Sequence, residues 1–168
     1  PLIASSIMSK KLASGADAIC LDVKVGNGAF MTDLEEAKKL AILMVQIGKL
    51  AGKSVKAILT NMDEPLGFAV GNTLEVIEAI ETLQGKGPKD LESVVLEIGS
   101  YLLEDAGIAK KEEAMALLKS KLENGEALQK LVELVTAQGG DASYILNPEK
   151  FKRATQVLPL KAQQSGYI

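Results

Sequence analysis

Two polar side chains near the start of the chain, Ser6 and Lys10, have types and a spacing that could serve chemistry. Residues four apart on a helix lie on one face, so a hydroxyl and an ammonium could converge there on a single polar group. Such a pair could hold an oxygen or a ring nitrogen that gains negative charge. Spacing alone equally allows a helix cap beside a solvated lysine, which is the commoner use of these residue types.

A second candidate is the loop 24–28, in which Gly26 and Gly28 would let the backbone approach a ligand closely. The loop follows an apolar run, 18–23, that predicts a strand buried on both faces. The carboxyl ends of parallel strands are where α/β proteins hold ligands. Met31 stands where a dinucleotide fingerprint needs its third glycine, which argues against a dinucleotide. A turn that simply requires glycine is the alternative.

The turn-rich segment 61–71 is a third candidate, because its backbone carbonyls are not all used by a helix. Together with Glu78 on the following helix, such carbonyls could coordinate a hard cation. The competing interpretation is a solvated glutamate on an amphipathic helix, which is far more frequent.

The elements that must position these groups form an α/β pattern. A short helix is expected over 5–13. A helix with a capping box from Thr32 to Glu35 then lies between the strand 18–23 and a second strand, 55–60. Strand, helix and strand predict a parallel βαβ unit, hence a partial sheet covered by several helices. Further helices are expected from a cap at Asn72 to Gly85, and over 91–105, 111–123 and 126–137.

Composition narrows the chemistry. The 168 residues contain no histidine, which excludes Ser-His triads and His-based zinc sites. A net charge of −3 with interspersed signs argues against nucleic acid as a partner, and no apolar stretch is long enough to span a membrane. The single cysteine, Cys20, suits a reducing compartment, so a cytoplasmic location is expected. Two or three strands cannot complete an α/β sheet, which suggests a piece of a longer protein.

Four segments together resemble the pyrimidine-nucleoside and thymidine phosphorylases. They are residues 1–11 (PLIASSIMSKK), 21–31 (LDVKVGNGAFM), 71–76 (GNTLEV) and 138–141 (QGGD). The resemblance implies a small helical domain and a large α/β domain with the substrate cleft between them. Residues 1–16 would be the last helix of the separate helical domain. Residues 17–168 would be the central part of the α/β domain. Within them, residues 155–168 would be the start of the C-terminal portion of that domain.

The resemblance also implies roles for single residues. Ser6 and Lys10 would bind the polar edge of the pyrimidine, with Lys10 as the catalytic residue, and Ile7 and Phe30 would make the apolar contacts to the base. In the bacterial pyrimidine-nucleoside branch a potassium ion is held partly by groups that correspond to Leu66, Ala69 and Glu78. No organic cofactor is implied.

The activity implied by the resemblance is phosphorolysis of uridine, thymidine or deoxyuridine to free base and (deoxy)ribose 1-phosphate. Phosphate is the co-substrate, and the family's phosphate-binding segments and one base-binding arginine would precede Pro1. We therefore expect the 168-residue chain alone to be inactive. The parent would be a homodimer through the helical domain, so these residues alone give little reason to expect a dimer. The alternatives are a related phosphoribosyltransferase, a nucleotide phosphorylase, or a non-catalytic binding module.

Overall fold

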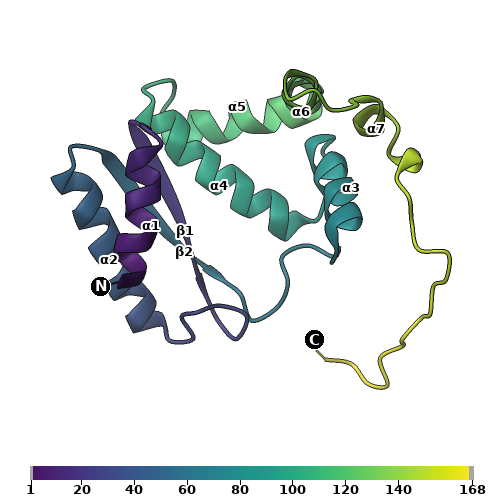
Figure 1. Cartoon of the computed structure of the whole chain (residues 1–168), viewed down its shortest axis with the longest axis horizontal. Coiled ribbons are helices and arrows are strands. Elements are labelled where there is room, and N and C mark those ends of the chain that lie inside the picture. The colour runs from purple at the N-terminus through teal and green to yellow at the C-terminus, as the bar shows by residue number, and fades with distance from the viewer. Residues whose placement is uncertain (1, 167–168) are drawn as a thin grey trace. The chain divides into compact units, whose positions relative to one another are not determined.

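The computed structural model describes residues 2–166, which form seven α-helices, one 3-10 helix and two strands in the order shown in Figure 1. The chain divides into two compact units. The first unit consists of Pro1–Pro65 and Ser93–Lys119, and the second of Leu66–Glu92 and Ser120–Ile168. Within the described residues, no helix has both the length and the apolar character needed to cross a membrane.

The first unit is built around a parallel strand pair. Strand β1 (Ala18–Val25) runs beside β2 (Ser54–Asn61), and helix α2 (Leu34–Leu50) connects them. The register pairs residue 18 with residue 54 and continues without a break to residues 25 and 61. The predicted parallel βαβ unit and the α/β class are thereby confirmed.

The core of this unit lies on one face of the strands. Alternate residues of β1 (Ile19, Leu21 and Val23) are buried there, as the two-residue period of a strand requires. Helix α1 (Leu2–Ala13) packs into the same core through Met8, whose side chain is fully buried. Burial of one such side chain stabilises the fold by about 1.5–3 kcal/mol. In this structure helix α1 therefore belongs to the first unit.

Helix α2 lies unusually close to the sheet. An atom added as Cβ at Gly48 would lie 2.1 Å from Cγ2 of Val55, so only glycine fits between this helix and β2. At the other end of the helix, the Asp33 carboxylate caps the first turn by accepting the N–H of Glu36 at 2.9 Å. The predicted capping box was wrong by one residue, because Asp33 rather than Thr32 is the cap.

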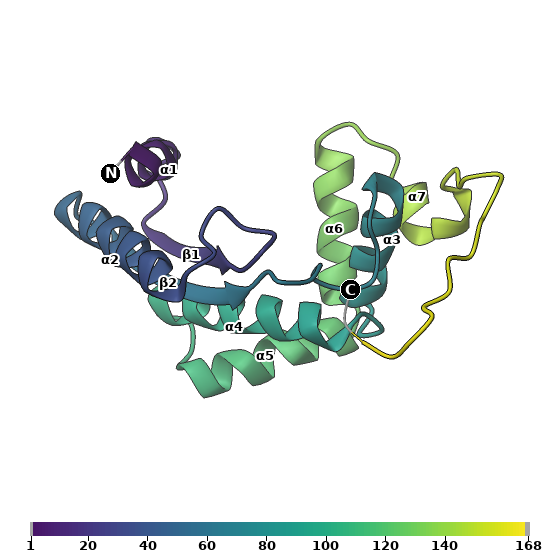
Figure 2. The ribbon, with the colours of Figure 1, turned by 90° about the horizontal axis from the view of Figure 1, so that it is seen from below.

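The other face of the strands carries polar side chains, and α4 (Lys89–Asp105) and α5 (Lys111–Glu123) lie on that side, opposite α1 and α2 (Figure 2). Nζ of Lys56 lies 2.6 Å from Glu104 and 2.8 Å from Asp105 of α4, and these hydrogen bonds raise the lysine pKa. β1 is half-buried on this face. The expectation of a strand buried on both faces was therefore wrong.

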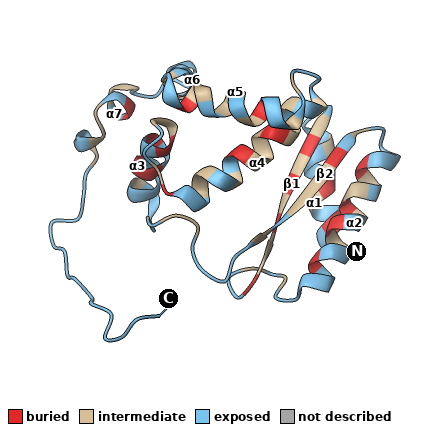
Figure 3. Cartoon of the chain, turned by 180° about the vertical axis from the view of Figure 1, so that it is seen from behind, coloured by how far each residue is buried: buried red, intermediate tan, exposed pale blue. Residues whose placement is uncertain are grey.

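The second unit contains α3 (Asn72–Leu83), α6 (Glu126–Ala137), the short α7 (Ser143–Leu146) and a 3-10 turn (Pro148–Lys150). Helix α6 contacts both α3 and α7. Figure 3 shows an extended, fully exposed stretch after these helices, in which Val157, Leu158 and Leu160 are the large apolar residues. The prediction that 155–168 begins a further portion stays a prediction, and its last two residues lie outside the described part.

Helix α3 begins differently from the expected pattern. Gly71, with a φ of +118°, precedes the first residue Asn72, and the Asn72 side chain does not cap the helix. Instead the Glu75 carboxylate accepts the N–H of Gly71 at 2.9 Å. Predicted helices α5 and α6 are confirmed with their boundaries, whereas α1 and α4 begin earlier than predicted. The assignment of residues 1–16 to a separate helical domain stays a prediction.

Candidate functional site

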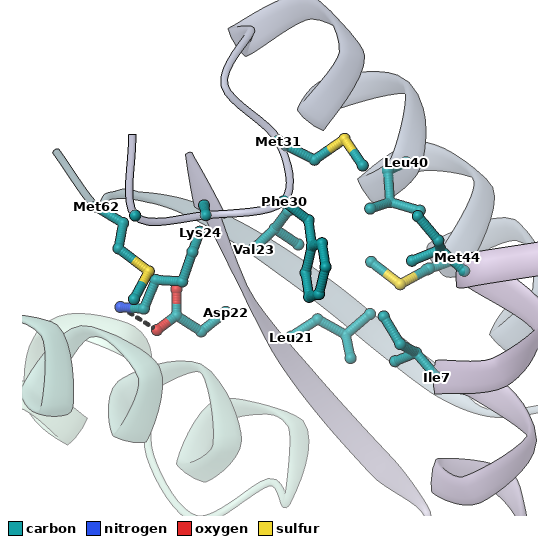
Figure 4. Close-up of a pocket in the computed structure, with 13 residues that line it drawn as sticks. Ile7, Leu21, Asp22, Val23, Lys24, Phe30, Met31, Leu40, Met44 and Met62 are labelled. Carbon is teal, nitrogen blue, oxygen red and sulfur yellow. Dashed lines mark ion pairs between the residues drawn. The ribbon is translucent and has the colours of Figure 1, made fainter. Parts of the chain in front are cut away.

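A pocket of about 350 Å³ opens beside the carboxyl end of β1. Ile7 of α1 and Phe30 of the loop that follows β1 point into it from two sides, as Figure 4 shows. Its floor is formed by β1 and α2 side chains such as Leu21 and Met44. The volume lies in the range of small-molecule sites, and the lining is mainly apolar. The structure thus brings two sequence-predicted contact residues, 23 positions apart, onto one cavity.

Phe30 lines the pocket without being packed into the core. Its side chain is 97% exposed, so one wall of the pocket is a free aromatic face. Ile7 is half-buried and sits on the core helix next to fully buried Met8. A flat, apolar ligand face could therefore be covered by an aliphatic branch on one side and by the ring on the other.

Ser6 and Lys10 are exposed and are not among the residues that line the pocket. With about 100° of rotation per residue, positions 3, 6, 7 and 10 of a helix fall within an arc of about 100°. Ile3 and Ile7 both line the pocket, so the hydroxyl and the ammonium border the same apolar stripe. Within the described residues, Lys10 forms no ion pair with a carboxylate. The pair is available to a ligand, and its role stays a prediction.

The loop 26–31 is shaped by two glycines. Gly26 has a φ of +138°, and a Cβ there would lie 2.6 Å from the backbone nitrogen of Asp63. A Cβ on Gly28 would lie 2.9 Å from the carbonyl oxygen of Met62. Both glycines are needed because the loop closes against the chain that leaves β2. The close backbone approach at these glycines is made to another part of the chain, and the predicted approach to a ligand stays a prediction.

The pocket also has a polar side that the sequence did not single out. Asp22 and Lys24 line it and form an ion pair of 2.8 Å, drawn as a dashed line in Figure 4. Thr60 of β2 donates its hydroxyl to the other carboxylate oxygen of Asp22 at 2.5 Å. Positions 22 and 24 share the face of β1 opposite Ile19, Leu21 and Val23. This alternation was the signal that could have identified them.

The predicted cation ligands lie in the second unit, on the loop 66–71 and on α3. Oε1 of Glu78 accepts the N–H groups of Phe68 and Ala69 at 2.8 and 3.0 Å. In a trans peptide the carbonyl points opposite to the N–H, so the carbonyls of Gly67 and Phe68, which share these two peptide units, point away from the carboxylate. The carbonyls of Leu66 and Ala69 belong to other peptide units, so the two bonds to Glu78 do not fix the direction of these carbonyls.

A carboxylate and backbone carbonyls are ligand types that a hard cation prefers, and Oε1 of Glu78 is already engaged by two N–H groups of the loop. Asp90 also supports the loop by accepting the N–H of Gly67 at 2.8 Å, and this bond lowers the pKa of the Asp90 carboxyl. Within the described part of the chain, no group of three acidic, histidine or cysteine side chains could hold a metal ion by side chains alone. Cation binding here stays a prediction.

The thiol of Cys20 is not suited to nucleophilic chemistry. It is half-buried on the α4 side of β1, and burial together with the nearby Asp105 carboxylate raises its pKa. A thiol with a raised pKa is largely protonated near neutral pH, and the protonated form is a poor nucleophile.

Comparison with known proteins defines the class first. The chain matches the model of the glycosyl transferase family, a/b domain, over residues 1–128. It therefore belongs to this family of α/β glycosyl transferases.

Particular relatives are more specific. Over 169 aligned positions the chain is 50% identical to the pyrimidine-nucleoside phosphorylase of Geobacillus stearothermophilus. It is 53% identical to the pyrimidine-nucleoside phosphorylase of Staphylococcus haemolyticus (strain JCSC1435). In both cases the alignment covers 100% of this chain and 39% of the relative. The resemblance indicated by the sequence motifs is confirmed, and the chain spans about two fifths of the length of these relatives.

Proposed function

We propose that this chain forms the base-binding part of a pyrimidine-nucleoside phosphorylase. Such an enzyme transfers the sugar of uridine, thymidine or deoxyuridine from the base to phosphate and releases free base and (deoxy)ribose 1-phosphate. The observation that carries the proposal is the pocket on which Ile7 and Phe30 meet, with Ser6 and Lys10 on the neighbouring part of the α1 surface. A planar pyrimidine between the aliphatic and aromatic side chains would turn its polar edge toward the hydroxyl and the ammonium.

The chemistry assigned to Ser6 and Lys10 follows from how charge moves in this reaction. Phosphate attacks the anomeric carbon as the bond from that carbon to the base nitrogen breaks. The electron pair of that bond stays with the departing base, which becomes anionic. Hydrogen bonds from an ammonium and a hydroxyl strengthen as this charge grows, so they stabilise the transition state more than the bound nucleoside.

We further propose that the 168 residues alone do not turn over nucleosides. Phosphate carries between one and two negative charges near neutral pH and is usually bound by several cationic or N–H donors. Within the described residues, the pocket is lined by one cationic side chain, Lys24, and that lysine is already paired with Asp22. The phosphate-binding groups of the active enzyme would then come from other parts of the longer protein.

Three features of the whole enzyme are also proposed: its cation, its location and its oligomeric state. A potassium ion would be held partly by the carbonyls of Leu66 and Ala69 and by the Glu78 carboxylate, where its charge could stabilise the loop 66–71. The active enzyme would be a cytoplasmic homodimer.

Calorimetric titration of the chain with thymine and uracil tests the proposed site. We expect both pyrimidines to bind and adenine, as a purine control, to bind much less. Lys10→Ala should weaken thymine binding about tenfold, because it removes a charge-assisted hydrogen bond. Lys11→Ala is the matched control, because it removes the same charge one position along the same helix. Equal losses in the two variants, or no binding to the unchanged chain, would contradict the proposal.

In a full-length enzyme that carries these residues, Lys10→Ala should lower kcat/KM by about 10² to 10³. The effect is expected mainly in kcat, because the contact strengthens only as the base leaves. A near-normal kcat would show that Lys10 does not stabilise the leaving base.

A further inference from the structure

The exposed ring of Phe30 has to be held in place by its backbone. With 97% of its side chain exposed, packing does little to fix its position. The loop closes on itself through two bonds, from the N–H of Gly26 to the carbonyl of Met31 and from the N–H of Ala29 to the carbonyl of Gly26, both 3.0 Å long. These bonds define a tight turn, but they do not connect the turn to the rest of the sheet.

Two further bonds attach the turn to the chain that leaves β2. The N–H of Gly28 donates to the carbonyl of Met62 at 2.8 Å. The N–H of Asn27 donates to Oδ1 of Asp63 at 2.9 Å. The Asp63 backbone is itself fixed, because its N–H donates to the side-chain oxygen of Asn61 at 3.0 Å. Asp63 thus links the end of β2 to the middle of the loop that carries Phe30.

The fit between Asp63 and the loop is close. A Cβ added at Gly26 would lie 2.7 Å from Oδ1 of Asp63, the same oxygen that accepts from Asn27. The carboxylate therefore occupies the space that a side chain at position 26 would need. Glycine at this position and aspartate at position 63 are complementary, although the two residues lie 37 positions apart.

We propose that Asp63 is a positioning residue, which sets where the Phe30 ring stands over the pyrimidine site. The proposal rests on the proposed function, since it assumes that the ring contacts the base. Asp63 is exposed and lies outside the buried core, so its loss should loosen the loop without opening the core. Its effect on binding would act through the order of Phe30, not through contact with the ligand.

The chain contains no tryptophan, so Phe30→Trp places a single indole, which can be excited selectively, at the position in question. In this background, time-resolved anisotropy of the indole measures how freely the loop moves, with no ligand present. Asp63→Ala removes the acceptor, whereas Asp63→Asn keeps an oxygen that can accept from Asn27. Glu64→Ala is the matched control, because it removes an exposed carboxylate from the adjacent position. Circular dichroism and thermal melting of each variant report on the global fold.

We expect Asp63→Ala to increase the fast, local depolarisation of the indole and to leave the circular dichroism spectrum unchanged. Asp63→Asn should restore the parent signal, and Glu64→Ala should not alter it. In the Phe30 background, Asp63→Ala should weaken thymine binding by calorimetry about tenfold, with rescue by Asp63→Asn. If Asp63→Ala does not fold, Asp63→Glu misplaces the same oxygens by one methylene and should give the same pattern.

The outcomes separate this inference from the proposed function. Unchanged indole anisotropy in Asp63→Ala, or thymine binding equal to that of the parent, overturns the role of Asp63 alone. Failure of the unsubstituted chain to bind thymine overturns the proposed base site, whatever the Asp63 variants show. A loss of anisotropy that coincides with a loss of helical signal would make Asp63 a residue of general stability and would also overturn its positioning role.

Discussion

The loops 26–31 and 66–71 are built from similar residues but are held in different ways. Each follows a strand of the same parallel pair, contains at least one glycine with positive φ, and presents an exposed phenylalanine, Phe30 or Phe68. The first loop is attached largely by backbone bonds, to itself and to Met62. The second is attached by carboxylates, because Asp90, Glu78 and Glu75 accept N–H groups from four of its residues.

The difference shows what each loop depends on. Backbone bonds beside a strand end persist in almost any sequence that allows the chain to come close, so the first loop depends on its glycines and on one carboxylate, Asp63. Carboxylates on helices can be removed one at a time, so the second loop depends on particular charged side chains. We therefore expect the two loops to fail under different substitutions.

The largest effect should come from Glu78→Ala in the second loop. Glu78 is 9% exposed and accepts two N–H groups, so its removal leaves both donors without their partner. Hydrogen bonds to a charged group contribute about 1.5–3 kcal/mol each, and partial access of water to the opened loop lowers the sum. The free energy of unfolding of the second unit should fall by about 3 kcal/mol, measured by urea denaturation.

Two variants of the same helix calibrate this prediction. Glu78→Gln retains an oxygen acceptor and should cost about 1 kcal/mol. Glu81→Ala removes an exposed carboxylate from α3 and should cost less than about 0.5 kcal/mol. Amide hydrogen exchange at Phe68 and Ala69 should accelerate in Glu78→Ala alone. Equal exchange rates in all three variants would mean that the carboxylate does not hold the loop.

Gly26→Ala is the corresponding test of the first loop. The substitution combines an unfavourable φ of +138° with a Cβ at 2.6 Å from the Asp63 nitrogen. We expect the first unit to lose about 2 kcal/mol of stability by urea denaturation. Gly15→Ala is the control, because Gly15 has a φ of +76° with no atom near its Cβ position, and it should cost about 1 kcal/mol. Equal costs would show that the close approach to Asp63 adds nothing.

A smaller effect is expected from Asp90→Ala, which removes one carboxylate from the second loop. Asp90 accepts the N–H of Gly67, and its lowered pKa shows that this bond favours the charged form. The group is largely exposed, so the loss should be about 1 kcal/mol. Faster amide exchange confined to Gly67 would support this. Exchange that accelerates equally at Phe68 would show that the three carboxylates act as one unit.

The contrast between the loops also marks what the sequence could reveal. The strand and helix pattern followed from apolar periodicity, and the residues around the pocket followed from the family resemblance. The pairing of Ile7 with Phe30 on one cavity agrees with that resemblance. No sequence motif pointed to Asp63 as a support of the first loop, because its bond to Asn27 joins positions 36 apart and has no local signature.

The misplaced caps have a similar cause. Thr32 and Asp33 are both good N-cap residues, and so is Asn72. The choice among adjacent candidates depends on where the chain enters the helix, which the preceding loop decides. At α3 that loop is held by Glu75 and Glu78. Gly71 is therefore the N-cap residue in place of Asn72, and its N–H is bound by the Glu75 carboxylate.

The smallest change in stability should come from the two exposed rings, and it gives the sharpest functional contrast. Phe30→Ala and Phe68→Ala each remove a side chain that is at least 87% exposed, so neither should change the free energy of unfolding by more than about 0.5 kcal/mol. Thymine binding should fall about tenfold in Phe30→Ala, because stacking on an aromatic face contributes roughly 1–3 kcal/mol per base. It should be unchanged in Phe68→Ala, since Phe68 does not line the pocket. A similar loss of affinity in both variants, measured by calorimetry, would mean that thymine is not bound where Ile7 and Phe30 meet.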